Sequence, residues 1–244
     1  MITSKGNVWF KRVRKAIREH EDEIVVEGPK AVHDAIAAGW KPIAVIHAST
    51  PHPAFGPRTD EGHTFSPELF KEIADTKTSQ GVIGLFERPR WSADQILGRR
   101  DSIAIALDGV QDPGNVGTII RLAAAFDAAG VILLPGCADP FGPKAIRASA
   151  GAILSVPVAS MTREALLASN IGLYAADGTA AEWEPPACDA VLIFGGEGGG
   201  ISRDLRARAK GIAVRTSGRV ESLNVAAAAA VLLWRSFRSR AGHG

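Results

Sequence analysis

The chain has 244 residues, 46% of them hydrophobic and 22% charged, with a formal net charge of +2, so the totals fit an ordinary globular protein and do not by themselves indicate a nucleic-acid partner. Its two cysteines and six histidines show neither the spacing of a disulfide framework nor that of a metal site. No apolar run reaches the roughly 18 residues of a membrane span, and the N-terminus lacks the apolar core of a signal peptide; we therefore expect a cytoplasmic protein without a metal or a membrane partner.

Residues 1–88 are predicted to form a small α/β domain. Residues 1–20 hold six basic side chains against one acid, Glu19. Ser66 is the expected N-cap of a helix that begins with a proline. The helix expected in residues 1–20 has an apolar stripe formed by Val8, Trp9, Val13 and Ile17. The other expected elements are strands at 24–27, 43–47 and 81–86, a helix at 29–39 and a loop at 49–63.

Residues 89–101 are polar and are predicted to be a linker, and residues 102–244 a second domain. Strands are expected there at 103–107, 131–134, 154–158, 171–175, 191–194 and 212–214, and helices at 116–126, 143–151, 163–168, 202–209 and 223–237. Short apolar strands that alternate with helices predict a parallel sheet covered on both faces. Ligands of such sheets bind beyond the carboxyl ends of the strands.

The first candidate site follows the strand at 103–107. Segment 108–117 is rich in Gly and Asp, and we expect Asn115 to cap the next helix. Arg121 lies about a turn and a half into that helix, among apolar residues. The pattern indicates either an arginine with a partner at a functional site, because unpaired charge is costly to bury, or a simple turn followed by a solvent-facing arginine.

The second candidate site is the glycine cluster at 195–200, which follows an apolar strand and has Glu197 at its centre. It matches neither the dinucleotide fingerprint nor the phosphate-binding loop. Since Glu197 would repel an anion, a ligand with a positive centre or hydrogen-bond donors fits better. The alternative is a flexible loop.

The third candidate site is segment 217–224. We expect Ser222 to be a helix N-cap. Asn224 then falls in the first turn, where free backbone amides and its own side-chain amide can orient a ligand. Residues 226–230 are all alanine, which favours either close approach of a helix or ligand, or simply helix formation.

Basic residues alternate with aromatic ones in segments 1–20 and 234–240. Such clusters serve RNA backbones and unstacked bases. They are equally compatible with amphipathic helices that have solvated charges and core aromatics.

Taken together, the segments 115–121, 194–202 and 218–225 resemble the three motifs of the SpoU (TrmH-like) family of RNA ribose 2′-O-methyltransferases, in the SPOUT superfamily. The similarity spans residues 103–238. Residues Asn7, Lys11 and 27–29 resemble the ribosomal-protein-L30e-like RNA-binding domain that many members carry. The resemblance implies an α/β fold with a SPOUT-type parallel sheet, a C-terminal trefoil knot and an L30e-like domain before it. It further implies S-adenosyl-L-methionine as cofactor, RNA as substrate and a homodimer whose active site is completed across the interface.

The resemblance also assigns roles to residues. The implied catalytic residues are Arg121, Asn115, Glu197, Ser222 and Asn224; the implied cofactor-binding residues are Gly195, Val214, Thr216 and Leu223; the implied RNA-binding residues are Lys5, Asn7, Lys11, Arg12 and Arg147. Arg121 corresponds to an arginine proposed to deprotonate the ribose hydroxyl, although a guanidinium is a poor base and could equally act electrostatically. Residues 214–216 depart from the family's Ile-Pro-Met-like triplet, which affects the expected cofactor contacts.

We therefore predict an RNA 2′-O-ribose methyltransferase that acts on ribosomal RNA. Three alternatives remain: a transfer RNA 2′-O-methyltransferase, a non-catalytic knotted RNA-binding protein, and a nucleotide-binding metabolic enzyme with a doubly wound sheet. The absent dinucleotide and phosphate-loop patterns count against the last.

Overall fold

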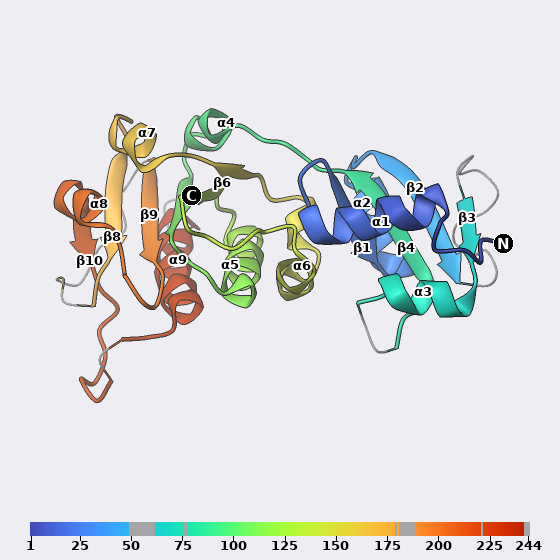
Figure 1. The fold of residues 1–244 in the computed structure, drawn as a ribbon. Coiled ribbons are helices and arrows are strands. Elements are labelled where there is room, and N and C mark those ends of the chain that lie inside the picture. The colour runs from blue at the N-terminus through green and yellow to red at the C-terminus, as the bar shows by residue number, and fades with distance from the viewer. Residues whose placement is uncertain (49–61, 76–77, 179, 181–188, 221, 242–244) are drawn as a thin grey trace. The chain divides into compact units, whose positions relative to one another are not determined.

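The computed structural model describes residues 1–48, 62–75, 78–178, 180, 189–220 and 222–241. The chain forms two compact units, one of Met1–Pro89 with Phe141–Ile146 and the other of Arg90–Pro140 with Arg147–Gly244. Each unit has its own sheet (Figure 1). No described helix combines the length and the apolar character needed to cross a membrane.

The first unit has a four-stranded sheet in the order β1-β4-β2-β3. Strands β1 and β2 run antiparallel to β4, whereas β3 runs parallel to β2. Helices α1 and α3 pack on the sheet around Phe10, Ile46 and Leu69, and α2 contacts β1 and β4. The bounds are α1 Val8–Glu19, β1 Glu23–Glu27, α2 Pro29–Ala37, β2 Pro42–Ala48, β3 Gly62–Phe65, α3 Pro67–Ile73 and β4 Val82–Glu87.

Three sequence predictions for this unit have different outcomes. The Ser66 cap is confirmed, because its Oγ accepts a hydrogen bond from the Leu69 amide at 3.4 Å. The predicted apolar stripe of α1 is wrong at Val8, which is 69% exposed; the helix buries Phe10, Val13 and Ala16, which share one face at helical spacing. The expected loop at 49–63 lies outside the described residues except for 62 and 63, which belong to β3.

The second unit confirms the predicted parallel sheet. Its six strands have the order β10-β8-β9-β5-β6-β7, and every neighbouring pair is parallel. The expected strand at 154–158 begins only at Val158, because residues Ala152–Leu154 form a 3₁₀ turn, η1. The strand bounds are β5 Ile103–Asp108, β6 Gly130–Leu133, β7 Val158–Ser160, β8 Gly172–Ala176, β9 Ala190–Gly195 and β10 Lys210–Ile212.

Helices cover both faces of this sheet. Ile96 of α4, Leu166 of α7 and Leu205 of α8 are buried against one face. Helix α5 contacts β6, α9 contacts β9, and α5 and α9 contact each other on the opposite face (Figure 1). The bounds are α4 Ala93–Leu97, α5 Pro113–Ala125, α7 Arg163–Leu167, α8 Arg203–Arg208 and α9 Val225–Ala241. The remaining helix, α6 Pro143–Ser149, has residues assigned to each unit. Strands β5, β6 and β9 are therefore buried on both sides, as their continuous apolar sequences predict.

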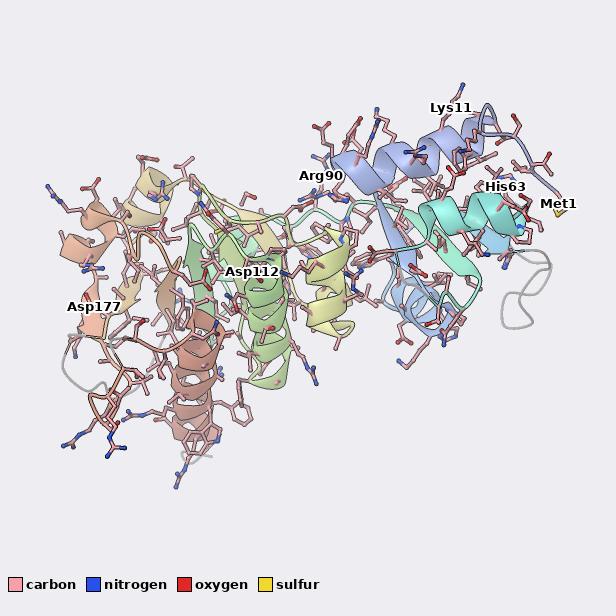
Figure 2. The ribbon with its side chains drawn as sticks, turned by 60° about the horizontal axis from the view of Figure 1, so that its bottom comes forward. Met1, Lys11, His63, Arg90, Asp112 and Asp177 are labelled. Carbon is pink, nitrogen blue, oxygen red and sulfur yellow. The ribbon has the colours of Figure 1, made fainter. Side chains whose placement is uncertain are left out.

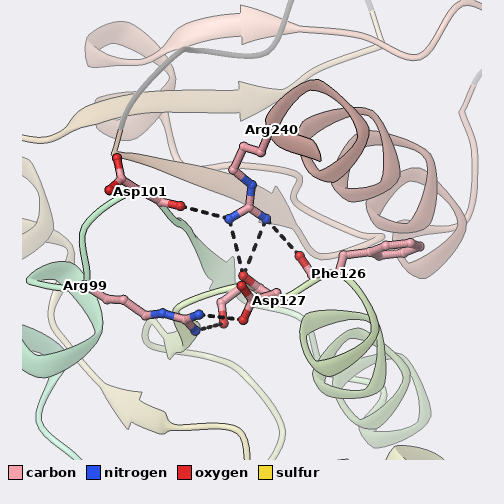
Figure 3. Close-up of polar contacts among 6 residues, drawn as sticks. Arg99, Asp101, Phe126, Asp127 and Arg240 are labelled. Carbon is pink, nitrogen blue, oxygen red and sulfur yellow. Dashed lines mark hydrogen bonds and ion pairs between the residues drawn. The ribbon is translucent and has the colours of Figure 1, made fainter. Parts of the chain in front are cut away.

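Arg240 fastens the C-terminal end of α9 to this unit, and Arg99 reinforces the turn that it contacts. Arg240 donates hydrogen bonds to the carbonyl oxygens of Asp101 at 3.1 Å and Phe126 at 2.9 Å (Figure 3). Arg99 forms an ion pair of 2.5 Å with Asp127 in the same turn. The end of α9 is thus tied to the turn after α5 and to the residues before β5.

Candidate active site

A cavity of about 310 Å³ opens beyond the carboxyl ends of β8, β9 and β10. This is where a ligand of a parallel sheet is expected. All four sequence-predicted cofactor-binding residues line it, and so do Glu197 and Ser222. The other lining residues are Ala176, Asp177, Gly178, Phe194, Gly196, Gly200, Ile201, Arg206, Ile212, Ala213, Val225, Ala228 and Leu232.

The glycine loop at 195–200 forms one wall of this cavity, and the backbone is too crowded for a side chain at Gly195 and Gly196. A Cβ atom at Gly195 would lie 2.2 Å from the carbonyl carbon of Gly200, and one at Gly196 would lie 2.1 Å from the carbonyl oxygen of Gly109. Gly200 has φ +62°, which favours glycine. The loop therefore closes on itself and lies directly on the chain that follows β5.

Asn115 lies in the first turn of α5 and is not its cap, contrary to the sequence prediction. Helix α5 begins at Pro113, and Asp112 is the N-cap, accepting the Asn115 amide at 3.0 Å. Figure 2 shows Asp112 at the start of this helix. Because Asp112 satisfies the free amide, the Asn115 side chain is left to donate a hydrogen bond from Nδ2 to the Glu197 carboxylate.

Helix α9 is capped by Asn224, which corrects the prediction of Ser222 as the cap. Asn224 Oδ1 accepts the amides of Ala226 at 2.9 Å and Ala227 at 3.2 Å. Its Nδ2 donates to Asn115 Oδ1 at 3.2 Å. Glu197, Asn115 and Asn224 thus form one hydrogen-bonded chain that joins the glycine loop to the N-termini of α5 and α9.

Arg121 is not part of this hydrogen-bonded chain. It lies on the exposed side of α5, and no described residue of this chain forms a hydrogen bond or an ion pair with it. Six residues after Asn115, it points about 120° away around the helix axis. The structure therefore brings together four of the five predicted catalytic residues and leaves Arg121 at the surface.

The cavity also contains a charged pair that the sequence prediction missed. The Asp177 carboxylate lies 3.2 Å from the Arg206 guanidinium, and both residues line the cavity. Asp177 directly follows β8 (Figure 2), so the rule that sites form at the carboxyl ends of strands was the signal that could have identified it. Among the described residues, no cluster of His, Cys, Asp and Glu is suited to hold a metal ion.

The thiol of Cys137 lies nearby but is poorly suited to act as a nucleophile. Its Sγ donates to the Leu107 carbonyl oxygen at 3.1 Å. Burial raises the pKa of this thiol above its ordinary value, and the negative charge of Asp108 raises it further, against the opposing effect of backbone hydrogen bonds. The thiolate, which is the reactive form, is therefore disfavoured.

Comparison with known proteins decides the family. Residues 102–234 match the model of the SpoU rRNA Methylase family. The chain belongs to this family. Residues 11–84 match the MRM3-like substrate binding domain, so the SpoU methylase domain is preceded by a recognised substrate-binding domain.

Relatives of the SpoU family resemble the chain over almost its full length. A protein of Synechocystis described as an uncharacterized tRNA/rRNA methyltransferase is 30% identical over 98% of this chain and 94% of its own. The Bacillus subtilis 23S rRNA (guanosine(2553)-2′-O)-methyltransferase RlmP is 28% identical over 93% of each chain. The crystal structure of an AdoMet-bound rRNA methyltransferase from Sinorhizobium meliloti has a TM-score of 0.87 at 27% identity, covering 98% of this chain and 97% of the other.

The predicted RNA-binding residues have several environments. Lys11 is exposed on α1 and extends away from the helix (Figure 2). Lys5 pairs with Glu72 at 2.6 Å, and Arg12 is held by Glu23 at 2.6 Å and lies over the Trp9 ring. The other two are Asn7, which caps α1 by accepting the Trp9 amide at 2.9 Å, and Arg147, which is exposed on α6.

Proposed function

We propose that this SpoU family member is an S-adenosyl-L-methionine-dependent 2′-O-ribose methyltransferase that acts on ribosomal RNA. The observation that carries the proposal is that segments 194–202 and 218–225 line one cavity, while segment 115–121 is joined to both by the hydrogen-bonded chain of Asn115, Glu197 and Asn224. The 23S rRNA 2′-O-methyltransferase activity of the relative RlmP supports the substrate and the position of methylation. An rRNA substrate also supports a cytoplasmic location, which the sequence predicts.

The cavity fits the proposed cofactor chemically. Its wall combines apolar side chains, among them Leu223 and Leu232, with the carboxylates of Asp177 and Glu197 and with closely packed glycine backbone. Apolar walls suit an adenine ring, and carboxylates suit a cationic ligand. S-adenosyl-L-methionine supplies a methyl group on a positively charged sulfur. Gly195, Val214, Thr216 and Leu223 are the residues that we propose to hold it.

We assign Ser222 and the polar residues of the hydrogen-bonded chain beside the cavity to the ribose. The hydroxyl of Ser222 and the amides of Asn115 and Asn224 can donate to or accept from a ribose 2′-hydroxyl. The hydrogen bond to Asn115 holds Glu197 in place. Because a guanidinium is a poor base, we assign Arg121 to stabilising negative charge on the ribose oxygen.

A homodimer explains why Arg121 lies outside the cavity of its own chain. On α9, Val231, Trp234 and Phe237 are 38%, 47% and 38% exposed. Large apolar side chains grouped on one exposed helix are typical of an interface. We propose that a second copy covers this face, with Arg121 of one chain serving the cavity of the other.

We further propose that the C-terminal segment forms a trefoil knot. The chain leaves the edge strand β10 and returns so that α9 packs on β9 and α5 near the middle of the sheet. The glycine loop that follows β9 lies against the chain after β5 without room for a Cβ atom at Gly196. Both features support a threaded arrangement.

The deciding experiment is methyl transfer from radiolabelled S-adenosyl-L-methionine to purified rRNA and tRNA, followed by mapping of 2′-O-methylated nucleotides. We expect label in rRNA at a ribose 2′-oxygen. Label in tRNA alone would support the transfer RNA alternative instead. Cofactor binding by calorimetry without transfer to either RNA would support the non-catalytic RNA-binding alternative.

A further inference from the structure

Among the described residues of the second unit, the most deeply buried carboxylate has no part in the proposed chemistry. Asp108 ends β5, its side chain is 2% exposed, and it does not line the cavity. Burying a charge is unfavourable unless it is paired and fully hydrogen-bonded. The contacts of Asp108 must therefore offset the free-energy cost of burying its charge.

Both oxygens of this carboxylate are satisfied. Oδ1 accepts a hydrogen bond from Arg163 Nε at 2.7 Å and an ion-pair contact from its Nη2 at 2.5 Å. Oδ2 accepts the backbone amide of Ser202 at 2.7 Å. The backbone carbonyl of Asp108 also accepts the amide of Gly196 at 2.9 Å. One residue thus binds both ends of the segment 196–202.

That segment forms the cavity wall that carries Glu197. The wall lies on the end of β5, because Gly196 approaches Gly109 too closely for a side chain. Beyond Glu197, its contributions to the cavity are Gly196, Gly200 and Ile201. The hydrogen bonds to the Gly196 and Ser202 amides therefore hold Glu197 in position relative to Asn115.

Arg163 completes the arrangement from α7. Its Nη2 also donates to the Pro135 carbonyl oxygen at 2.8 Å, just after β6. The guanidinium therefore neutralises the buried carboxylate and holds it toward Ser202. Without Arg163 the carboxylate would be buried without a counter-charge.

We infer that Asp108 is the positioning residue of the glycine loop: paired with Arg163, it holds Gly196 and Ser202 and thereby sets the cofactor-binding wall of the cavity. The inference rests on the proposed function, because it takes the cavity to be the S-adenosyl-L-methionine site. It assigns Asp108 an effect on cofactor affinity beyond any effect on stability.

The test compares variants by calorimetric titration with S-adenosylhomocysteine and by thermal melting. Asp108→Asn keeps the shape of the side chain. Its NH2 group, however, must point at either the Arg163 guanidinium or the Ser202 amide, and both of these are donors. We expect the Kd to rise about tenfold or more, as loss of a hydrogen bond to a charged group implies. The matched control is Leu166→Ala on α7, a buried core residue whose apolar side chain forms no hydrogen bond to the loop; it should lower the melting temperature and leave the Kd unchanged.

A double variant provides the rescue. In Asp108→Asn with Arg163→Gln, the asparagine amide can donate to the glutamine oxygen while its own oxygen still accepts the Ser202 amide. Since both charges are removed together, this variant is expected to fold and to bind within about threefold of wild type.

The inference is overturned if Asp108→Asn weakens binding no more than Leu166→Ala does, or if the folded double variant does not recover affinity. Should Asp108→Asn fail to fold, the double variant decides alone. Failure of the proposed function looks different, because wild-type protein would then bind no S-adenosylhomocysteine, with or without RNA.

Discussion

At the scale of single residues, Arg121 differs from the rest of the proposed catalytic set because it neither lines the cavity nor joins the hydrogen-bonded chain of Glu197, Asn115 and Asn224. This separation allows chemistry and cofactor binding to be tested independently. A residue that stabilises charge only during the reaction affects turnover, whereas a residue in the cavity wall affects affinity.

We predict that Arg121→Ala lowers kcat by about 100-fold or more, which is the usual effect of removing one electrostatic donor, and leaves the Kd for S-adenosylhomocysteine unchanged. Steady-state methyl transfer and calorimetry measure the two quantities. Arg208→Ala, which removes an exposed charge from α8, is the control. Unchanged kcat in Arg121→Ala would remove Arg121 from the mechanism.

Asn224 has two functions in the structure, and one substitution separates them. Its oxygen caps α9, while its amide donates to Asn115. The substitution Asn224→Asp would keep the cap, since aspartate and asparagine are equally good caps. It would also remove the donor to Asn115 and place a second carboxylate near Glu197.

We therefore predict that Asn224→Asp keeps the free energy of unfolding within about 0.5 kcal/mol of wild type, while kcat falls about tenfold because the hydrogen-bonded chain is broken. Asn224→Ala should lose both functions and about 1 kcal/mol of stability. Urea denaturation measures the free energy of unfolding, and methyl-transfer assays measure kcat. Full activity of Asn224→Asp would show that the Asn115–Asn224 hydrogen bond is dispensable.

At the scale of helices and strands, the far end of α9 depends on side chain to backbone contacts. Arg240 donates to the carbonyls of Asp101 and Phe126, and also to that of Asp127 at 3.4 Å from Nη2. Ala228 and Leu232 of the same helix line the cavity. The Arg240 contacts therefore also help to hold the cavity-lining part of α9 in place.

We predict that Arg240→Ala lowers the free energy of unfolding by about 1–3 kcal/mol, because it leaves several carbonyl oxygens without their charged donor. Arg238→Ala is the control, since Arg238 is exposed and lies 5.5 Å from the Trp234 ring centroid; its loss should cost about 0.5–1 kcal/mol. Chemical denaturation of both variants measures the difference. Equal stabilities of the two would contradict the structural role of Arg240.

Periodicity and strand-end rules predicted most of the second unit because its strands are continuous apolar segments and its helices have regular apolar faces. They could not predict β3, whose residues Gly62–Phe65 lack alternation and extend because β2 offers a parallel edge. They also misplaced two helix caps, because Asp112 and Asn115, like Ser222 and Asn224, are competing caps a few residues apart. Asp108 pairs with Arg163, and Asp177 pairs with Arg206. These pairs depend on the order of the strands in the sheet, which local sequence patterns do not reveal.

At the scale of the whole molecule, the proposed homodimer makes each active site depend on two chains. If Arg121 serves the partner's cavity, a chain without Arg121 still has an intact cavity, and a chain without Glu197 still has an intact Arg121. Two inactive variants can then complement each other, because a mixed dimer contains one complete site.

We predict that Arg121→Ala and Glu197→Ala are each inactive, and that unfolding and refolding them together restores about one quarter of wild-type activity, since half of the random dimers are mixed and half of their sites are complete. Light scattering after gel filtration establishes the dimer, and Trp234→Arg on the exposed face of α9 should shift it toward monomer. No recovery from a mixture that light scattering shows to be dimeric would mean that Arg121 acts within its own chain, and the exposed position of Arg121 would then require movement of α5 or of the RNA toward the cavity.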